Sequence, residues 1–206
     1  RGFPLACVAS NIPIQTHERM VKISVQQGVV DRDPDVDAIF RLTQPQEVYF
    51  EKKETPLALA PKTFAPFNSQ NTLFYRSAFW ALLLPVTTTF RECDIWRSYW
   101  TERLLHDLGL TVGYLSPAVE QMRNEHDLFK DFLDEVGMYV NSARFIKDVQ
   151  QWNSEESLLD LKMLNLMGYL IDRGYFKKEE LAFVKAWIAD LKAVGYSFEG
   201  MLECSK

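Results

Sequence analysis

The sequence predicts an α/β protein with a helical C-terminal tail. An apolar strand-like run (Trp80–Pro85), a helical pattern that starts near Asp94 and a second apolar run (Leu110–Leu115) follow one another. This strand, helix, strand order is typical of an α/β sheet. Further along the chain, apolar residues recur at helical spacing. We therefore expect an α/β portion over residues 1–120 and a helical region over residues 121–206 packed on it.

The composition is that of an ordinary globular protein. The 206 residues are 47% hydrophobic and 25% charged, which fits one large or two small domains. The net charge of −5 argues against nucleic acid as the main partner, because phosphates require a basic face. No run of about 18 apolar residues is present, so the sequence predicts no membrane span. The chain starts without methionine or a signal-peptide pattern, and we interpret it as a piece of a longer protein.

The N-terminal part is expected to hold short strands joined by loops. One or two strands are predicted within residues 1–30. The alternating pattern of Ile39–Thr43 favours another short strand. Residues 44–66 carry four prolines, which indicates a surface loop, with Val48–Glu51 as a candidate strand inside it.

An acidic run, Asp31–Asp37, contains three overlapping Asp-x-Asp pairs, which suggests a metal site. An EF-hand loop needs glycine at its sixth position and glutamate at its twelfth. Counted from Asp31 these positions are Val36 and Leu42, so the EF-hand interpretation fails. Aspartates that close turns on their own backbone favour a structural turn here instead.

The helical region is expected to contain three helices. The first turns these apolar side chains inward: Leu128, Phe129, Phe132, Leu133 and Val136. Gly137 is a candidate break in that helix. Asn153, with Glu156 three residues later, resembles a capping box that opens the second helix, which closes at Gly174. The third runs from about residue 178 to 194 and forms an αα-hairpin with the second.

The stretch from Ala65 to Trp100 is unusually rich in polar side chains. It holds an amide-rich turn, residues 68–71, a threonine triplet, and a charged cluster from Arg91 to Arg97. Buried amides, guanidinium groups and carboxylates are costly unless they are partnered. The stretch is therefore either a structural hydrogen-bond network or the floor of a polar-ligand site, and the sequence leaves both open.

Asp94 has two interpretations. It stands where a helix should begin, so it is a good N-cap, and the same position would present a general base at the edge of a sheet. The helix that follows is expected to end at Gly109.

Several side chains suit a ligand with many hydroxyl groups. Asn68, Gln70 and Asn71 offer paired donors and acceptors, and the ring of Trp96 is suited to stacking on a sugar. His126 lies near Arg123 at a predicted strand-to-helix junction, where α/β proteins place ligand groups, although it is equally a helix-start residue. These residues together predict a polyol-binding α/β domain.

Three segments carry a family resemblance: DPDVDAIFRLT (Asp33–Thr43), APFNSQNTLF (Ala65–Phe74) and LPVTTTFRECDIWRSYW (Leu84–Trp100). They resemble the STELLO family of glycosyltransferase-like proteins, over roughly residues 31–127. A weaker likeness links Asp35–Ala38, Asp94–Trp96 and His126 to the reversibly glycosylated polypeptides, the plant UDP-arabinopyranose mutases.

The resemblance implies the C-terminal, acceptor-handling part of a GT-A-like mixed sheet flanked by helices, with a nucleotide sugar and a glycan acceptor as partners. The donor half would be absent or only partly represented by residues 1–30. Asp94 would be the catalytic base, and His126 would contact a divalent cation (Mn²⁺ or Mg²⁺) or the diphosphate. The expected substrate contacts are Asn68, Gln70, Asn71, Arg91, Trp96, Arg97 and Arg123.

The same resemblance implies a location in the Golgi lumen, and it leaves a second function open. STELLO proteins in plants associate with cellulose synthase. The alternative is therefore a non-catalytic scaffold that binds a glycan or a protein, with a homo-oligomer or a protein partner as the expected assembly.

Overall fold

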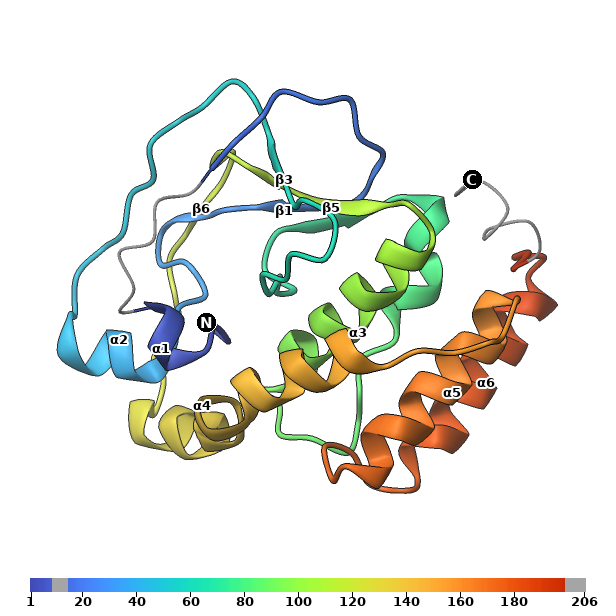
Figure 1. Ribbon diagram of the computed structural model, residues 1–206. Helices are drawn as coiled ribbons and strands as arrows, with labels where there is room; N and C mark the ends of the chain where they lie inside the picture. Colours follow the sequence, from blue (N-terminus) through green and yellow to red (C-terminus); the bar gives the residue numbers. More distant parts are fainter. Residues whose placement is uncertain (9–14, 199–206) are drawn as a thin grey trace.

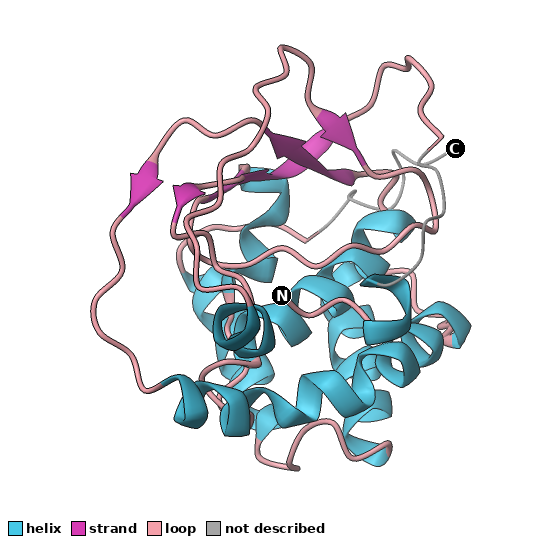
Figure 2. Ribbon diagram, turned by 90° about the vertical axis from the view of Figure 1, so that its left-hand side faces the viewer, coloured by secondary structure: helices cyan, strands magenta, loops and turns pink. Residues whose placement is uncertain are grey.

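A mixed four-stranded sheet covers a layer of helices in the computed structural model, which describes residues 1–8 and 15–198. The strand order is β3-β5-β1-β4. The central strands β1 (Ile23–Gly28) and β5 (Thr111–Leu115) are parallel, and the edge strands β3 (Leu57–Ala58) and β4 (Thr72–Phe74) run antiparallel to them. The helices lie on one side of this sheet (Figures 1 and 2). The predicted α/β class and the helical C-terminal tail are confirmed.

A second, very short ladder joins two distant segments. β2 (Asp31–Arg32) pairs in parallel with β6 (Glu120–Gln121), so each strand has only two residues. Arg32 adopts a positive φ of 72° and exchanges backbone hydrogen bonds with Val48. The candidate strand at Val48–Glu51 is thereby reduced to one isolated bridge.

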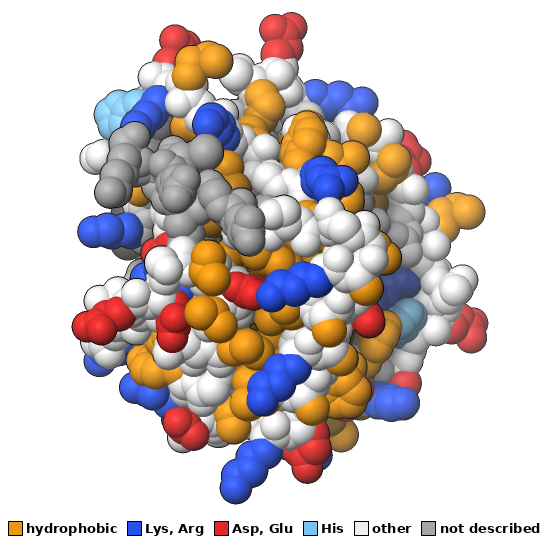
Figure 3. Space-filling view, turned by 90° about the vertical axis from the view of Figure 1, so that its right-hand side faces the viewer, with side chains coloured by type: hydrophobic (Ala, Val, Ile, Leu, Met, Phe, Trp, Pro, Cys, Tyr) orange, Lys and Arg blue, Asp and Glu red, His pale blue; other side chains and the backbone are white. Residues whose placement is uncertain are grey.

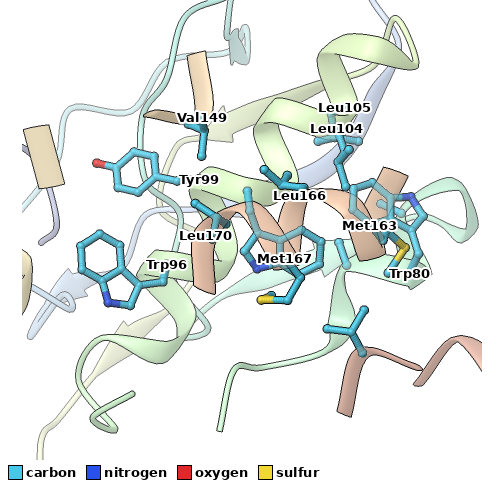
Figure 4. Packing of buried hydrophobic residues seen from close by; sticks show 14 of the residues in the cluster. Trp80, Trp96, Tyr99, Leu104, Leu105, Val149, Met163, Leu166, Met167 and Leu170 are labelled. Carbon is cyan, nitrogen blue, oxygen red and sulfur yellow. The ribbon is translucent and has the colours of Figure 1, made fainter. Parts of the chain in front are cut away.

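The helix α3 (Cys93–Asp107) runs through the centre of the molecule (Figure 1) and is buried on nearly all sides. Its Trp96, Tyr99, Leu104 and Leu105 belong to one continuous apolar core (Figure 4). Gly109 follows the helix with a φ of 64°, which is the left-handed conformation of a C′ glycine. The predicted helix, its end and the strand that follows it are confirmed.

Two C-terminal helices complete the core. α5 (Leu159–Asp172) packs against α3 through Met163, Leu166, Met167 and Leu170 (Figure 4). α6 (Glu180–Ala193) lies against α5, which confirms the predicted hairpin. On this side of the molecule, apolar side chains are interspersed with charged ones (Figure 3). None of the helices in the described residues is long and apolar enough to span a bilayer.

The predicted capping box is wrong. The residue at the N-cap of α5 is Leu158, and the Ser154 hydroxyl, not Asn153, accepts a hydrogen bond from the Glu156 backbone. The turn before α5 is therefore closed locally, two residues ahead of the helix.

Two predicted strands are helices. Ile39–Thr43 lies in α2 (Ala38–Thr43), because the Asp37 carboxylate accepts the Phe40 N–H as an N-cap. Trp80–Pro85 overlaps a 3₁₀ helix, η1 (Arg76–Leu82). A further short helix, α1 (Leu5–Val8), lies near the N-terminus. Apolar runs this short do not distinguish a strand from a buried helical turn.

The long helix α4 (Leu128–Gln151) turns the opposite face to the one predicted. Phe129 is 72% exposed and Leu133 is 68% exposed, whereas Glu135 on the inner face is fully buried. Val136 is also exposed, and Leu128 and Phe132 are only half-buried. The prediction of an inward Leu128–Val136 face is wrong, because over these residues the inner face meets charged and backbone polar groups, and the helix joins the apolar core only from Met138 onward.

Gly137 does not interrupt α4. A Cβ at this position would lie 1.9 Å from the Glu92 carboxylate, so the glycine allows that side chain to approach the helix. Burial raises the pKa of Glu92, although hydrogen bonds from Thr89 oppose the shift.

Gly137→Ala is expected to lower the free energy of unfolding by about 1–3 kcal/mol, although alanine is the better helix former, because the new methyl group must displace Glu92. Gly168→Ala in α5 is the matched control, since a Cβ there meets nothing within 4 Å. That variant should gain roughly 0.5–1 kcal/mol. Chemical denaturation measures both, and equal effects at the two positions would contradict the close approach.

A second prediction concerns Glu102 on α3, a carboxyl that is 1% exposed. Its Oε2 accepts the Ala65 N–H, and Oε1 has no hydrogen-bond partner among the described residues. Burial raises the pKa of Glu102 well above its usual range, although the Ala65 hydrogen bond opposes the shift. The native protein therefore keeps a proton that the unfolded chain releases above about pH 4.3.

The free energy of unfolding consequently falls as pH rises from that value towards the native pKa of Glu102. Glu102→Gln removes this titration, so between about pH 4 and pH 7.5 the variant should gain roughly 1–3 kcal/mol relative to the wild type. Urea denaturation at both pH values checks this, with the exposed Glu155→Gln as control. The same pH dependence in wild type and Glu102→Gln would refute the assignment.

Candidate functional site

Asp94 lies in the first turn of α3 and is engaged by protein groups on both carboxylate oxygens. The Arg1 guanidinium donates to Oδ1 and Oδ2 at 2.9 and 3.0 Å, and the Ser69 backbone N–H donates to Oδ2 at 3.0 Å. The N-cap position of α3 is held by Glu92. The N-cap interpretation of Asp94 is therefore wrong, and its carboxylate belongs to a buried ionic cluster.

The buried charge network is the name we give to Arg1, Asp35, Arg91, Asp94 and Glu135. Arg1 pairs with Asp35 at 2.8 Å, and Arg91 pairs with both Asp35, at 3.3 Å, and Glu135. The side chains are at most 12% exposed. Buried charges are tolerated only when their hydrogen bonds are well satisfied. The predicted substrate residue Arg91 is thus held by two carboxylates inside the protein.

Glu135 extends this network to the start of α2. Its Oε2 accepts the Ala38 backbone N–H at 2.7 Å and also the Tyr139 hydroxyl. Its Oε1 accepts the Arg91 Nε–H at 2.8 Å. Both oxygens of this fully buried carboxylate are therefore in use.

Arg97 and Trp96 are buried, unlike side chains that contact a substrate at the surface. The Arg97 guanidinium donates to the Ser69 hydroxyl at 3.0 Å and lies over the rings of Phe67 and Phe74. Burial lowers the pKa of Arg97 to about 10, against the opposing effect of Asp94. The Trp96 ring is 3% exposed and stacks on Phe145 with centroids 4.5 Å apart, so it offers no face to solvent.

The amide-rich turn is tied into the protein by its own side chains. Gln70 accepts the Asp35 N–H at 2.9 Å and donates to the Asp33 carbonyl and to Gln121 at 3.0 and 2.7 Å. Asn68 accepts the Gln70 N–H at 3.0 Å. Asn71 is half-buried, and its carbonyl accepts hydrogen bonds from β1. For Gln70, the structural-network alternative holds.

The acidic run Asp31–Asp37 forms structural contacts, as its turn interpretation predicts. Asp31 accepts the Phe50 N–H, Asp33 pairs with Arg41, and Asp37 caps α2. With Asp35 in the buried charge network, each of the four carboxylates has its own protein partner.

A cavity of about 370 Å³ opens beside this run, and we call it the arginine pocket. It lies at the carboxyl ends of β2 and β6, the place where α/β proteins position ligand groups. Its size is at the lower end of the range for ligand sites, roughly 300–1,000 Å³. Its polar lining includes Arg32, Asp33, Arg41, Glu47, Arg123 and His126.

The arginine pocket brings the predicted pair Arg123 and His126 together and adds Arg41, which sequence reasoning missed. The Arg123 guanidinium lies 3.1 Å from Asp131 and 3.2 Å from the His126 Nδ1 atom. Burial lowers the pKa of Arg123, and the nearby positive charges of Arg41 and Arg91 lower it further. The signal that could have placed Arg41 is Asp37, which is a good N-cap and predicts a helix over residues 38–43.

The donor set around His126 does not fit a divalent cation. One carboxylate, Asp131, lies 3.3 Å from Nδ1, and the cationic Arg123 group lies 3.2 Å from Nδ1 and 3.1 Å from that carboxylate. Among residues 1–8 and 15–198, no three His, Cys, Asp or Glu side chains are grouped as a metal site would require. We derive no chemical step through a metal ion.

Comparisons with known proteins point to one family. A sequence profile described as "STELLO glycosyltransferases" matches residues 91–206. Two Arabidopsis thaliana proteins, "Probable glycosyltransferase STELLO1" and "Probable glycosyltransferase STELLO2", are 33% and 32% identical to this chain over 207 residues. These alignments cover 95% of this chain and 26% of each relative. The chain thus spans about a quarter of the length of the curated relatives it matches.

Removing the charge of Glu135 should be strongly destabilising, because it leaves Arg91 buried with only one carboxylate. Glu135→Gln is expected to lower the free energy of unfolding by about 3–5 kcal/mol. Glu54→Gln, in an exposed loop, is the control and should change it by less than about 0.5 kcal/mol. Urea denaturation of the wild type and the two variants measures these changes. If Glu135→Gln lowers the free energy of unfolding as little as the control does, the Arg91–Glu135 pair is not a stabilising contact.

Proposed function

The chain belongs to the STELLO family of glycosyltransferases, and on that premise we propose that it forms the acceptor-side part of a nucleotide-sugar-dependent enzyme with a GT-A-like fold. The mixed sheet with helices on one side supports this proposal. The relatives are much longer, so the complete activity is assigned to the longer family protein. We further propose that it works in the Golgi lumen on a glycan acceptor.

The observation that carries the proposal is the arginine pocket. It combines a ligand-sized cavity, a position at the carboxyl ends of parallel strands, and the guanidinium groups of Arg41 and Arg123. Guanidinium groups match the geometry and charge of phosphate oxygens. A nucleotide sugar presents such oxygens in the diphosphate that leaves when the sugar is transferred.

A continuous chain of contacts links this pocket to Asp94. Asp33 lines the pocket, and its carbonyl accepts from Gln70, whose side chain accepts the Asp35 N–H. Asp35 in turn shares Arg1 with Asp94. The pocket and the carboxylate that we propose as base are therefore connected by direct hydrogen bonds and ion pairs.

In this proposal Asp94 removes the proton of the acceptor hydroxyl while the sugar–phosphate bond breaks. Its oxygens already accept hydrogen bonds from Arg1 and Ser69, so the hydroxyl must replace one Arg1 N–H. The half-buried amides of Asn68 and Asn71 are the proposed contacts to the saccharide.

Calorimetric titration of the purified protein with UDP and with GDP tests the proposal. At least one nucleotide should bind, and Arg123→Gln should weaken that binding roughly tenfold or more, because a charge-assisted hydrogen bond is lost. Arg173→Gln, in a half-exposed position after α5, is the control. If neither nucleotide binds the wild type, the nucleotide-sugar proposal fails.

Asp94→Asn tests the base. In the longer protein that contains this chain, the release of nucleoside diphosphate from nucleotide sugars, with mixed oligosaccharides as acceptors, should fall about 100-fold or more. Nucleotide binding should persist, which separates lost chemistry from lost folding. The exposed Asp190→Asn should behave as the wild type. An Asp94→Asn protein that is folded and fully active would remove Asp94 from the mechanism.

A protein-binding scaffold is the second candidate function, and the outer face of α4 favours it. Phe129, Leu133, Val136 and Val140 follow one another at helical spacing, and all four are exposed, three of them by 68–72%. Apolar side chains gathered on one exposed face mark interaction surfaces. If this face binds protein, Leu133→Glu should weaken self-association in sedimentation velocity, and Leu161→Glu on α5 should not. Self-association that is unchanged in Leu133→Glu, or absent from the wild type, would refute this face as a self-association surface.

A further inference from the structure

We propose that the arginine pocket binds a phosphate-type anion directly through the guanidinium groups of Arg41 and Arg123, without an intervening divalent cation. The inference relies on the proposed function only for the source of the phosphate, a nucleotide sugar. The binding itself is carried by the geometry of the pocket.

One carboxylate holds both arginines on the wall of the cavity. Asp33 Oδ1 accepts from the Arg41 guanidinium at 3.0 Å, and Asp33 Oδ2 accepts the Arg123 backbone N–H at 3.2 Å. Arg41 belongs to α2 and Arg123 follows β6, so Asp33 joins segments about 80 residues apart. Asp33 thus positions the Arg41 guanidinium and the Arg123 backbone, and Asp131 accepts from the Arg123 guanidinium at 3.1 Å, so both groups are held before any ligand arrives.

Both guanidinium groups keep donors without a partner. The Nε atoms of Arg41 and Arg123 are buried and have no hydrogen-bond partner among the described residues. Their side chains are only 15% and 13% exposed. Buried donors are nearly always satisfied in native proteins, so two arginines that line one cavity and each keep an unpartnered Nε favour an absent acceptor. Neither Nε atom is accessible to a water-sized group, so the side chains must shift for the acceptor to reach them. A phosphate group offers several acceptor oxygens at once.

The charge balance at Arg123 points the same way. The pKa of Arg123 is lowered first by burial and then by Arg41 and Arg91, which are neighbouring positive charges. Asp131 opposes that shift and Asp33 is shared with Arg41, so the nearby carboxylates are already engaged. Glu47 on the pocket wall is paired with Arg32 at 3.1 Å. A bound anion would relieve the repulsion that remains.

A divalent cation fits the arginine pocket less well than a directly bound anion. The only carboxylate near His126 Nδ1 in the described chain is Asp131, which already binds Arg123. A metal at this ring would lie against a guanidinium group of the same sign. The positive charge that neutralises the phosphate would instead come from the two arginines.

The test uses inorganic pyrophosphate and orthophosphate as probes, titrated calorimetrically into the purified protein in EDTA and again with Mg²⁺ or Mn²⁺. We expect binding of pyrophosphate in EDTA, weakened roughly tenfold or more in Arg123→Gln and in Arg41→Gln. Arg144→Gln, an exposed arginine on α4, is the matched control and should bind as the wild type. If Arg41→Gln does not fold, Arg123→Gln alone is compared with the control.

The outcomes separate this inference from the proposed function. Pyrophosphate binding in EDTA, together with no binding of UDP or GDP, supports the anion site and overturns the nucleotide-sugar proposal. Binding that requires Mg²⁺ or Mn²⁺ overturns the inference and leaves the proposed function standing. No binding under any condition, or binding that is unchanged in the Arg123 and Arg41 variants, also overturns it.

Discussion

The buried salt bridge between Arg91 and Glu135 is the interaction on which the arrangement of the polar half of the molecule depends. Arg91 precedes α3, Glu135 lies on the inner face of α4, and the same carboxylate accepts a backbone N–H from the start of α2. A charge in the interior requires such complete partnering. The network therefore determines which face the first half of α4 turns inward and leaves Phe129 and Leu133 outside, whereas Met138, Phe145 and Val149 further along the helix enter the apolar core.

The parts of the fold that sequence predicts are those decided by local chemistry. The α3 helix with its glycine stop, the β5 strand and the α5–α6 hairpin each carry their own spacing and end signals. The face of α4 could not be predicted, because it follows from Arg91, some 40 residues earlier, and helical spacing alone favours the apolar side. Asp37 is a good N-cap residue, and this local signal is sufficient to predict α2.

The same division applies to the candidate site. Arg123 and His126 could be predicted from their place at a strand-to-helix junction, and the structure brings them together. The pocket itself could not, because its opposite wall comes from Asp33 and Arg41, about 80 residues away. For Asp94 the sequence offers a general base or an N-cap, and its actual partner Arg1 is invisible to any local pattern. Long-range ion pairs leave no periodic trace in a sequence.

The two-residue length of β2 and β6 has a kinetic consequence. These strands pair over two positions, whereas β1 and β5 pair over five. A ladder this short separates at a small fraction of the free energy needed to unfold the protein, so its backbone amides exchange with solvent sooner than those of β1. β2 leads into Asp33 and β6 leads into Arg123, so separation of this ladder would also release the two walls of the arginine pocket from each other.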